Sequence, residues 1–211
     1  MMTSPVHRFI DQSGPTLFVQ RPRRALFLDR DGVINADHGY VHTPEQTAWI
    51  PGIFALCRRA IAAGYLPIVL TNQAGIARGL YSEAQFIEHT RWLHGQFVEQ
   101  GAALFATFYC PHHPTEGVGR YAVDCNCRKP LPGMFEAAAR HFDLDMAHSI
   151  MIGDKASDLR AAKDGGVGQC FLLGDHDEFL RSPEGCAAIT SLDAVLSDVF
   201  PSAPANRQVA T

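Results

Sequence analysis

The chain has 211 residues, of which 46% are hydrophobic and 19% charged, and its formal net charge is −4 at pH 7. This composition is typical of a water-soluble globular protein, and the length suits one domain with a sizeable core. The negative charge excludes a general attraction to nucleic acid or acidic membranes, and no apolar run approaches the roughly 20 residues that span a bilayer. The N-terminal residues lack the apolar core of a signal peptide, so we expect a cytoplasmic protein without a membrane or nucleic-acid partner.

The predicted elements begin after an N-terminal lead-in over residues 1–24, and the sequence leaves open whether that lead-in packs on the domain. Residues 25–28 are a short continuous apolar run, typical of a strand buried on both faces of a parallel sheet. Similar runs predict strands over 66–70, 104–109, 149–152 and 169–173. Capping residues and apolar periodicity predict helices over about 51–63, 82–100, 133–142, 156–165 and 191–200.

The alternation of strands and helices predicts an α/β fold with a doubly wound parallel sheet and helices on both faces. We expect a single domain over residues 25–200 and a disordered tail over 201–211. The chain has no long insertion after the first helix, so short loops should stand in place of a large cap. His89 and His94, on the predicted helix 82–100, are assigned to its solvent face.

Two acids separated by one residue, Asp29 and Asp31, directly follow the first predicted strand. Ligands of open α/β sheets bind beyond the carboxyl ends of the strands, so these acids would stand at the mouth of a site. Two carboxylates this close repel each other when both are ionised, so either a cation joins them or one holds a proton. Both conditions suit phosphoryl transfer, with one carboxylate as nucleophile beside magnesium and the other as general acid. The alternative is an ordinary acidic turn.

Polar residues suited to phosphate chemistry accompany other predicted strands. Thr71 and Asn72 end the second strand, Asp154 follows the fourth, and Arg128 and Lys129 lie between the third and the fourth. A hydroxyl, an amide and an ammonium group can hold phosphoryl oxygens, and a third carboxylate completes a magnesium shell. Each residue alone is weak evidence, but their order and spacing together indicate a phosphate site.

The loop over residues 110–127 holds three of the six cysteines, Cys110, Cys125 and Cys127, together with His112 and His113. In an intracellular enzyme such a cluster binds metal more often than it forms disulfides. Three cysteines and one histidine would form a tetrahedral zinc site with every position filled by protein, which makes the metal structural. The alternative is three reduced cysteines in a flexible loop.

These segments together resemble the four motifs of the haloacid dehalogenase (HAD) superfamily of phosphatases, and the resemblance extends over roughly residues 25–175. The matching segments are Asp29-x-Asp31-Gly-Val, Thr71-Asn-Gln, Lys129-Pro and Gly153-Asp154-Lys-x-x-Asp158. The superfamily pattern implies that Asp158 supports the fourth-motif turn or the outer shell of the metal.

The same resemblance implies a Rossmann-like sheet and a set of roles. Asp29 would attack phosphorus and become an aspartyl phosphate, and Asp31 would protonate the leaving alcohol and then activate water. Thr71 and Lys129 would bind the phosphoryl oxygens. Magnesium would be held by Asp29, the backbone carbonyl of Asp31, and Asp154.

Within the superfamily, the cysteine loop resembles that of two families, the heptose bisphosphate phosphatases and the histidinol phosphatases. The Cys-x-His spacing of these families matches His112 rather than His113 as the fourth zinc ligand, beside Cys110, Cys125 and Cys127. The stretch over residues 29–41 resembles the D-glycero-D-manno-heptose-1,7-bisphosphate 7-phosphatases. That resemblance implies a substrate site lined by Asp37, His38, Gly39, Tyr40, Thr71, Asn72, Gln73, Ala74, Arg128, Lys129 and Lys155.

We therefore expect a monomeric, magnesium-dependent phosphomonoesterase with a structural zinc loop. Its small-molecule substrate would be a heptose bisphosphate that loses the C7 phosphate on the way to cell-surface sugar precursors. Three alternatives remain: a histidinol-phosphate phosphatase, a phosphotransferase with an acceptor other than water, and a zinc-stabilised module that has lost catalysis. The sequence does not decide the anomer of the heptose.

Overall fold

The computed structural model describes residues 6–10, 22–174 and 176–200, so the predicted tail over 201–211 lies outside the described residues. The strands of this part form one seven-stranded sheet in the order β1-β4-β3-β2-β5-β6-β7. Their bounds are β1 His7–Ile10, β2 Arg24–Leu28, β3 Tyr65–Asn72, β4 Ala106–Cys110, β5 Ile150–Gly153, β6 Gln169–Leu173 and β7 Ala187–Ile189.

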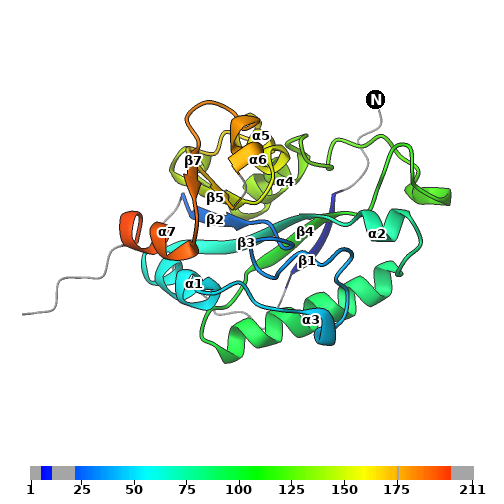
Figure 1. Cartoon of the computed structure of the whole chain (residues 1–211), viewed down its shortest axis with the longest axis horizontal. Helices are drawn as coiled ribbons and strands as arrows, with labels where there is room; N and C mark the ends of the chain where they lie inside the picture. Colours follow the sequence, from blue (N-terminus) through cyan, green and yellow to red (C-terminus); the bar gives the residue numbers. More distant parts are fainter. Residues whose placement is uncertain (1–5, 11–21, 175, 201–211) are drawn as a thin grey trace, which may run out of the picture.

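Helices cover both faces of this sheet (Figure 1), as the strand–helix alternation predicts. In Figure 1, α4, α5 and α6 lie above the sheet, while α1, α3 and α7 lie below it. The α-helices are α1 Ile53–Ala62, α2 Ala74–Ala77, α3 Glu83–Glu99, α4 Gly133–Phe142, α5 Ala156–Asp164, α6 His176–Leu180 and α7 Leu192–Asp198. Short 3-10 helices span Pro44–Gln46, Gly119–Tyr121 and Met146–His148. The α/β fold with helices on both faces is confirmed.

Strand β2 lies at the centre of the sheet, and its alternating side chains enter two separate cores. Phe27 pairs in register with Ile68 of β3 and Met151 of β5, and packs with the α4 and α5 side chains. Leu26 and Leu28 point to the opposite face, where α1, α3 and α7 cover them. Each of the residues 24–28 pairs with a residue of the parallel strand β3. This pairing fixes the direction in which the chain leaves the end of β2.

Two short strands extend the sheet beyond the five that the sequence predicts. β1 lies inside the lead-in and pairs antiparallel with β4, so the sheet is mostly rather than wholly parallel. Its His7 Nδ1 also lies 2.7 Å from Glu83 Oε1 at the start of α3. β7 adds three residues at the opposite edge, parallel to β6. β1 reads His-Arg-Phe-Ile and β7 reads Ala-Ala-Ile, so neither offers the three or more large apolar residues that each predicted strand contains.

The assignment of two histidines on α3 to solvent is wrong. His89 is 2% exposed and His94 is fully buried. Thr47 Oγ1 lies 2.9 Å from His89 Nε2, and Thr107 Oγ1 lies 2.9 Å from His94 Nε2. Both histidines belong to the buried helical stripe of Phe86, Thr90, Leu93 and Phe97, whose three- and four-residue spacing outweighs their polarity.

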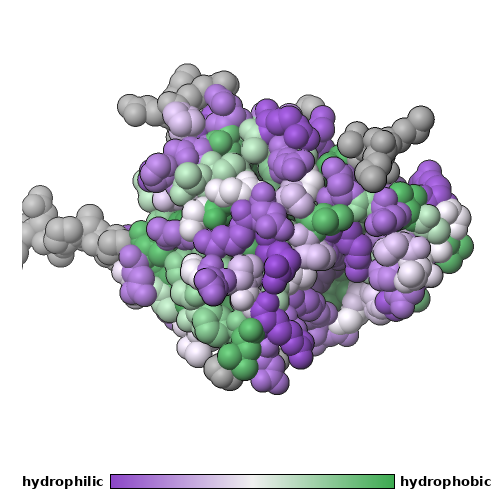
Figure 2. Space-filling model, turned by 90° about the horizontal axis from the view of Figure 1, so that it is seen from above, coloured by the Kyte–Doolittle hydropathy of each residue, from purple (hydrophilic) through white to green (hydrophobic). Residues whose placement is uncertain are grey.

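None of the helices in residues 6–10, 22–174 and 176–200 is both long enough and apolar enough to cross a bilayer. The face shown in Figure 2 is predominantly hydrophilic, with hydrophobic residues in separate groups.

Candidate phosphoryl-transfer and zinc sites

A cleft of about 430 Å³ opens where the carboxyl ends of the central strands meet. It is lined by Asp29, Asp31, Asp37, Gly39, Tyr40, Thr71, Asn72, Gln73, Ala74, Gly75, Tyr81, Arg128, Lys129, Lys155, Ser157 and Asp158. The end of β2 supplies the two acids and the end of β3 supplies the residues from Thr71 onward, because both strands run parallel and finish at one edge. The cleft therefore brings together ten of the eleven residues predicted for the substrate site.

His38 is the exception. It does not line this cleft but a neighbouring cavity of about 280 Å³ on the other side of its loop, beside Val41 and Glu45. In Asp37-His38-Gly39-Tyr40, the backbone turns at Gly39 and Tyr40, which both have positive φ. Asp37, Gly39 and Tyr40 line the cleft whereas His38 does not, so the substrate role of His38 stays a prediction.

Lys129 is the most buried charge in the site. Its Nζ lies 2.8 Å from Asp29 Oδ1 and 2.6 Å from Asp158 Oδ1, and donates to the Leu70 carbonyl over 2.7 Å. Burial alone lowers the pKa of Lys129, but Asp158 and Asp29 outweigh it and raise that pKa above its usual value. Its backbone is fixed too, since Lys129 N donates to Asn72 Oδ1 and the Asn72 amide donates to Lys129 O. The ammonium group stays charged beside the predicted nucleophile.

Asp31 is surrounded by donors. Arg30, itself 2% exposed, donates from Nε and Nη2 to both Asp31 oxygens, with a shortest distance of 2.8 Å. Asn35 Nδ2 donates to Asp31 Oδ1 over 3.0 Å, and Gln73 Nε2 donates to Asp31 Oδ2 over 3.2 Å. Burial raises the pKa of Asp31, but the Arg30 charge and these hydrogen bonds outweigh it and hold the pKa below its usual value.

Three carboxylates, the buried Asp29 and Asp158 and the partly buried Asp154, place ligand atoms within 4.8 Å of one another. Asp154 Oδ1 is buried and has no hydrogen-bond partner, as expected of an oxygen that can bind a cation. Gly32 leaves the space for this carboxylate, because a Cβ there would lie 2.3 Å from Asp154 Oδ2. The Asp158 oxygens are already engaged by Lys129 Nζ and by the Lys155 backbone N–H. The donor set of Asp29 and Asp154 therefore suits Mg²⁺, with Asp158 in a supporting position.

The two acids after β2 have unequal proton affinities. Burial raises the pKa of Asp29 to about 6, with Asp158 adding to the rise, whereas the pKa of Asp31 is lowered. A nucleophilic Asp29 and a proton-donating Asp31 require the opposite order. A divalent cation beside Asp29 lowers its pKa, and a phosphate dianion beside Asp31 raises the pKa of that acid. Substrate and metal together would thus bring both acids toward the states that their predicted roles need.

The metal-free protein should lose stability as pH rises. Burial raises the pKa of Asp29 from 3.8 to about 6, and burial together with Asp29 raises that of Asp154 from 3.8 to about 8. At these two acids the folded state therefore holds protons from about pH 4 to pH 8 that the unfolded chain releases, which favours unfolding as the pH rises. Burial lowers the pKa of His89 from 6.5 to about 4, which opposes this effect below about pH 6.5, so we expect the loss of stability mainly above that pH. Melting temperatures at pH 5–9, with and without MgCl₂, would test this. We expect Mg²⁺ to stabilise most at high pH, and a metal-free melting temperature that rises from pH 5 to 8 would contradict the assignment.

Charged residues form the outer part of the cleft. Lys155 Nζ lies 3.2 Å from Asp37 Oδ2 and 3.6 Å from Asp154 Oδ2, so it joins the loop after β2 to the end of β5. Arg128 Nη1 donates to the His112 carbonyl over 3.3 Å, which ties this arginine to the cysteine loop. Arg128 and Lys155 thus line the cleft from different loops, in addition to the buried Lys129.

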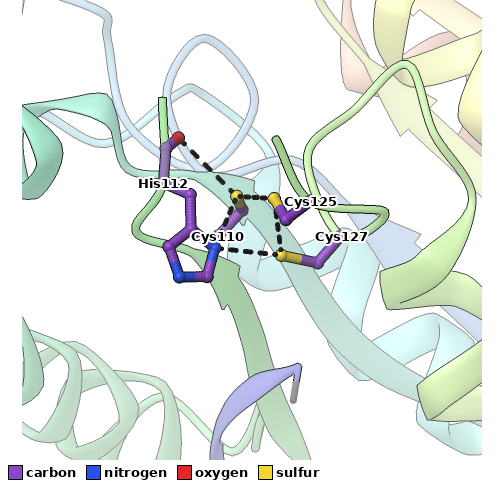
Figure 3. A group of neighbouring side chains, drawn as sticks. All are labelled: Cys110, His112, Cys125 and Cys127. Carbon is purple, nitrogen blue, oxygen red and sulfur yellow. Dashed lines mark hydrogen bonds between the residues drawn. The ribbon is translucent and has the colours of Figure 1, made fainter. Parts of the chain in front are cut away.

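The cysteine loop gathers four side chains at one point (Figure 3). Cys110, His112, Cys125 and Cys127 are all buried and point toward one another. The Sγ atoms of Cys110 and Cys125 are 3.5 Å apart, those of Cys125 and Cys127 3.2 Å, and His112 Nδ1 lies 3.6 Å from Cys127 Sγ. These separations approach the edges, about 3.8 Å between sulfurs, of a tetrahedron around zinc. His113 lies outside the cluster, with its Nδ1 accepting from the Glu116 N–H.

Arg30 and Tyr81 belong to the site but have no place among the sequence predictions. Arg30 lies between the two acids in sequence and binds both oxygens of Asp31. Its position next to both acids could have indicated this role. Tyr81 lines the cleft from the loop before α3, and nothing in its local sequence marks it.

Comparisons with known proteins agree with this geometry. A family model described as HAD-hydrolase-like matches residues 126–178. The D-glycero-alpha-D-manno-heptose-1,7-bisphosphate 7-phosphatase of Burkholderia mallei is 51% identical over 154 residues, which cover 73% of this chain and 82% of that protein. The D-glycero-beta-D-manno-heptose-1,7-bisphosphate 7-phosphatase of Vibrio cholerae is 44% identical, over 81% of this chain and 91% of that protein.

A solved structure gives the same result. The D,D-heptose 1,7-bisphosphate phosphatase from B. bronchiseptica, complexed with magnesium and phosphate, is similar with a TM-score of 0.75 and 33% identity. The similarity covers 85% of this chain and 99% of that one. The HAD-like fold, the phosphatase motifs and these identities lead to one conclusion: the chain belongs to the heptose-1,7-bisphosphate 7-phosphatase family of HAD-like phosphatases.

Proposed function

We propose that this chain removes the C7 phosphate of D-glycero-D-manno-heptose 1,7-bisphosphate, in the synthesis of cell-surface heptose precursors. One observation carries the proposal beyond the family. The cleft that holds Asp29 and Lys129 continues to Asp37, Arg128 and Lys155, so a second anionic group on the same small molecule meets cations from separate loops. A guanidinium group suits bidentate binding of a phosphate, and a carboxylate suits sugar hydroxyls.

The proposed reaction assigns one step to each inner residue. Asp29 attacks phosphorus, the bond to the sugar oxygen breaks, and Asp31 gives that oxygen its proton. Thr71 and Lys129 hold the phosphoryl oxygens. Asp31 then takes a proton from the water that hydrolyses the aspartyl phosphate. Asp29, Asp154 and the backbone carbonyl of Asp31 would hold Mg²⁺, which would neutralise charge on the phosphoryl group.

Phosphate release with magnesium tests the substrate. The α and β anomers of heptose 1,7-bisphosphate are compared with histidinol phosphate at equal concentration. We expect a kcat/KM for one bisphosphate anomer at least about 100-fold above that for histidinol phosphate, because an unfilled second-phosphate site leaves Arg128 without its partner. A preference for histidinol phosphate would refute the substrate while leaving the phosphatase chemistry in place. Transfer to an added alcohol at the expense of phosphate release would identify a phosphotransferase.

We further propose that Cys110, His112, Cys125 and Cys127 bind a structural zinc ion. The support is their convergence in Figure 3 and the bond from Arg128 to the His112 carbonyl, through which the ordered loop would position a substrate-binding cation. Zinc would not take part in the chemistry, because all four positions are filled by protein.

Replacing Cys125 by Ser should lower the zinc content well below one ion per chain. A hydroxyl is a poor zinc ligand, so we also expect a lower melting temperature and a higher KM for the bisphosphate, the latter through Arg128. Elemental analysis and thermal melts measure the two main effects. His113→Ala is the matched control, since His113 adjoins His112 in sequence but lies outside the cluster, and it should keep the full zinc content. Full occupancy in Cys125→Ser would refute the ligand set.

The proposed setting is the cytoplasm, with the protein acting as a monomer. All six cysteines lie in the described part of the chain and all are free, which suits a reducing compartment. The proposed site is built from one chain, so hydrolysis needs no second copy.

A further inference from the structure

The buried side chain of Tyr81 lies next to the proposed reacting groups of the cleft. Tyr81 is 4% exposed, and its ring stacks on His42 at 4.5 Å between centroids with 12° between planes. Its hydroxyl donates to Gln73 Oε1 over 2.5 Å. Arg30 lies beside the same hydroxyl and offers only donors, so the Tyr81 proton is directed to Gln73.

The side chain of Gln73 is hydrogen-bonded to two further residues, both with proposed roles in the reaction. Its side-chain Nε2 donates to Thr71 Oγ1 over 2.8 Å and to Asp31 Oδ2 over 3.2 Å. Gln73 is 1% exposed, so water does not compete for these atoms. One amide group therefore joins the proposed phosphoryl-binding hydroxyl to the proposed proton donor.

The amide of Gln73 has two faces that differ in their hydrogen-bonding chemistry, and only one orientation serves the site. Turned by half a rotation, its carbonyl oxygen would face the Asp31 carboxylate and repel it, and both Thr71 and Asp31 would lose a donor. The Tyr81 hydroxyl favours the observed orientation, because it satisfies Oε1, which is otherwise a buried acceptor.

We propose that Tyr81 is a positioning residue for phosphoryl transfer: it fixes the side-chain amide of Gln73, which in turn orients Thr71 and Asp31. The inference rests on the proposed roles of those two residues. The local backbone is built around the Tyr81 ring, since a Cβ on Gly75 would lie 2.2 Å from Tyr81 Cε1. Any side chain at position 75 would displace the phenol from Gln73.

A double-mutant cycle tests the proposal, with Tyr81→Phe, Gln73→Met and the two combined. The substrate is p-nitrophenyl phosphate with magnesium, which needs the phosphoryl site but none of the sugar contacts. We expect Tyr81→Phe to lower kcat about tenfold, the upper end for one hydrogen bond, with KM within about twofold. In the Gln73→Met background the same change should alter kcat by less than about twofold, because the amide through which Tyr81 acts is absent.

The control is Tyr109→Phe. Tyr109 is 3% exposed and packs in the same small hydrophobic cluster as Tyr81, but its hydroxyl donates to Glu83. It should keep the wild-type kcat even if its melting temperature falls. Gly75→Ala should reproduce the kcat loss of Tyr81→Phe.

Two outcomes would overturn the proposal: a wild-type kcat for Tyr81→Phe, or an equal fold loss in both Gln73 backgrounds. If the enzyme cleaves p-nitrophenyl phosphate but not the heptose bisphosphate, the proposed substrate fails while the cycle still decides the role of Tyr81.

Discussion

Asp29→Asn should reduce phosphate release by about 10⁴-fold or more while leaving the protein folded. The amide cannot attack phosphorus, so the covalent route is lost and only binding and charge stabilisation remain. The fold should persist because Asp29 is one of three clustered carboxylates, and its replacement relieves repulsion with Asp154 and Asp158. Steady-state phosphate release and thermal melts in magnesium measure the two effects.

A second variant separates the nucleophile from general damage at this position. Asp31→Asn should also be strongly impaired, but by slowing both half-reactions rather than by preventing the covalent step. Rapid mixing with substrate should therefore trap aspartyl phosphate in Asp31→Asn and none in Asp29→Asn. Turnover near the wild-type rate in Asp29→Asn would exclude it as the nucleophile.

Lys129→Met should damage both catalysis and stability. Lys129 is buried between Asp29 and Asp158, so its removal leaves two carboxylates without their cation. Breaking a buried ion pair on one side costs about 3–5 kcal/mol, or a fall in melting temperature on the order of 10 °C for a chain of this size. Activity should fall with it, because no ammonium group remains to hold the phosphoryl group.

The double variant Lys129→Met with Asp158→Asn provides the control. Asp158→Asn removes one of the two buried carboxylates that lost their cation. The double variant should therefore regain part of the stability that Lys129→Met loses. Activity should stay as low as in the single variant. If the double variant were active, or if Lys129→Met melted like the wild type, the ion-pair account would be wrong.

The inner site could be predicted from the sequence because its residues follow strands that share one edge. Asp29 and Thr71 end neighbouring parallel strands, so their proximity follows from the topology alone. The Cys/His cluster was equally predictable, because Cys110 with His112 and Cys125 with Cys127 are two short-range pairs of potential metal ligands. The resemblance to the HAD superfamily then supplied the roles.

What the sequence did not predict depends on how side chains reach across the fold. Tyr81 contacts Gln73 only because α2 is a single short helix that turns the chain back toward β3. His89 and His94 were assigned by residue type, whereas their spacing with Phe86 and Phe97 had placed them in the buried stripe. The position of Tyr81 thus depends on the three-dimensional fold. For the two histidines, the polarity of the residue was given more weight than its spacing in the helix.

The antiparallel strand β1 protects one edge of the sheet against pairing with other molecules. β4 would otherwise be the outermost strand on its side, and an uncovered strand edge presents unpaired N–H and C=O groups that recruit strands from other molecules. β1 occupies that edge with only four residues, and one of them is Arg8, opposite Phe108. β1 thus shields β4, whose last residue is Cys110, against edge-to-edge aggregation.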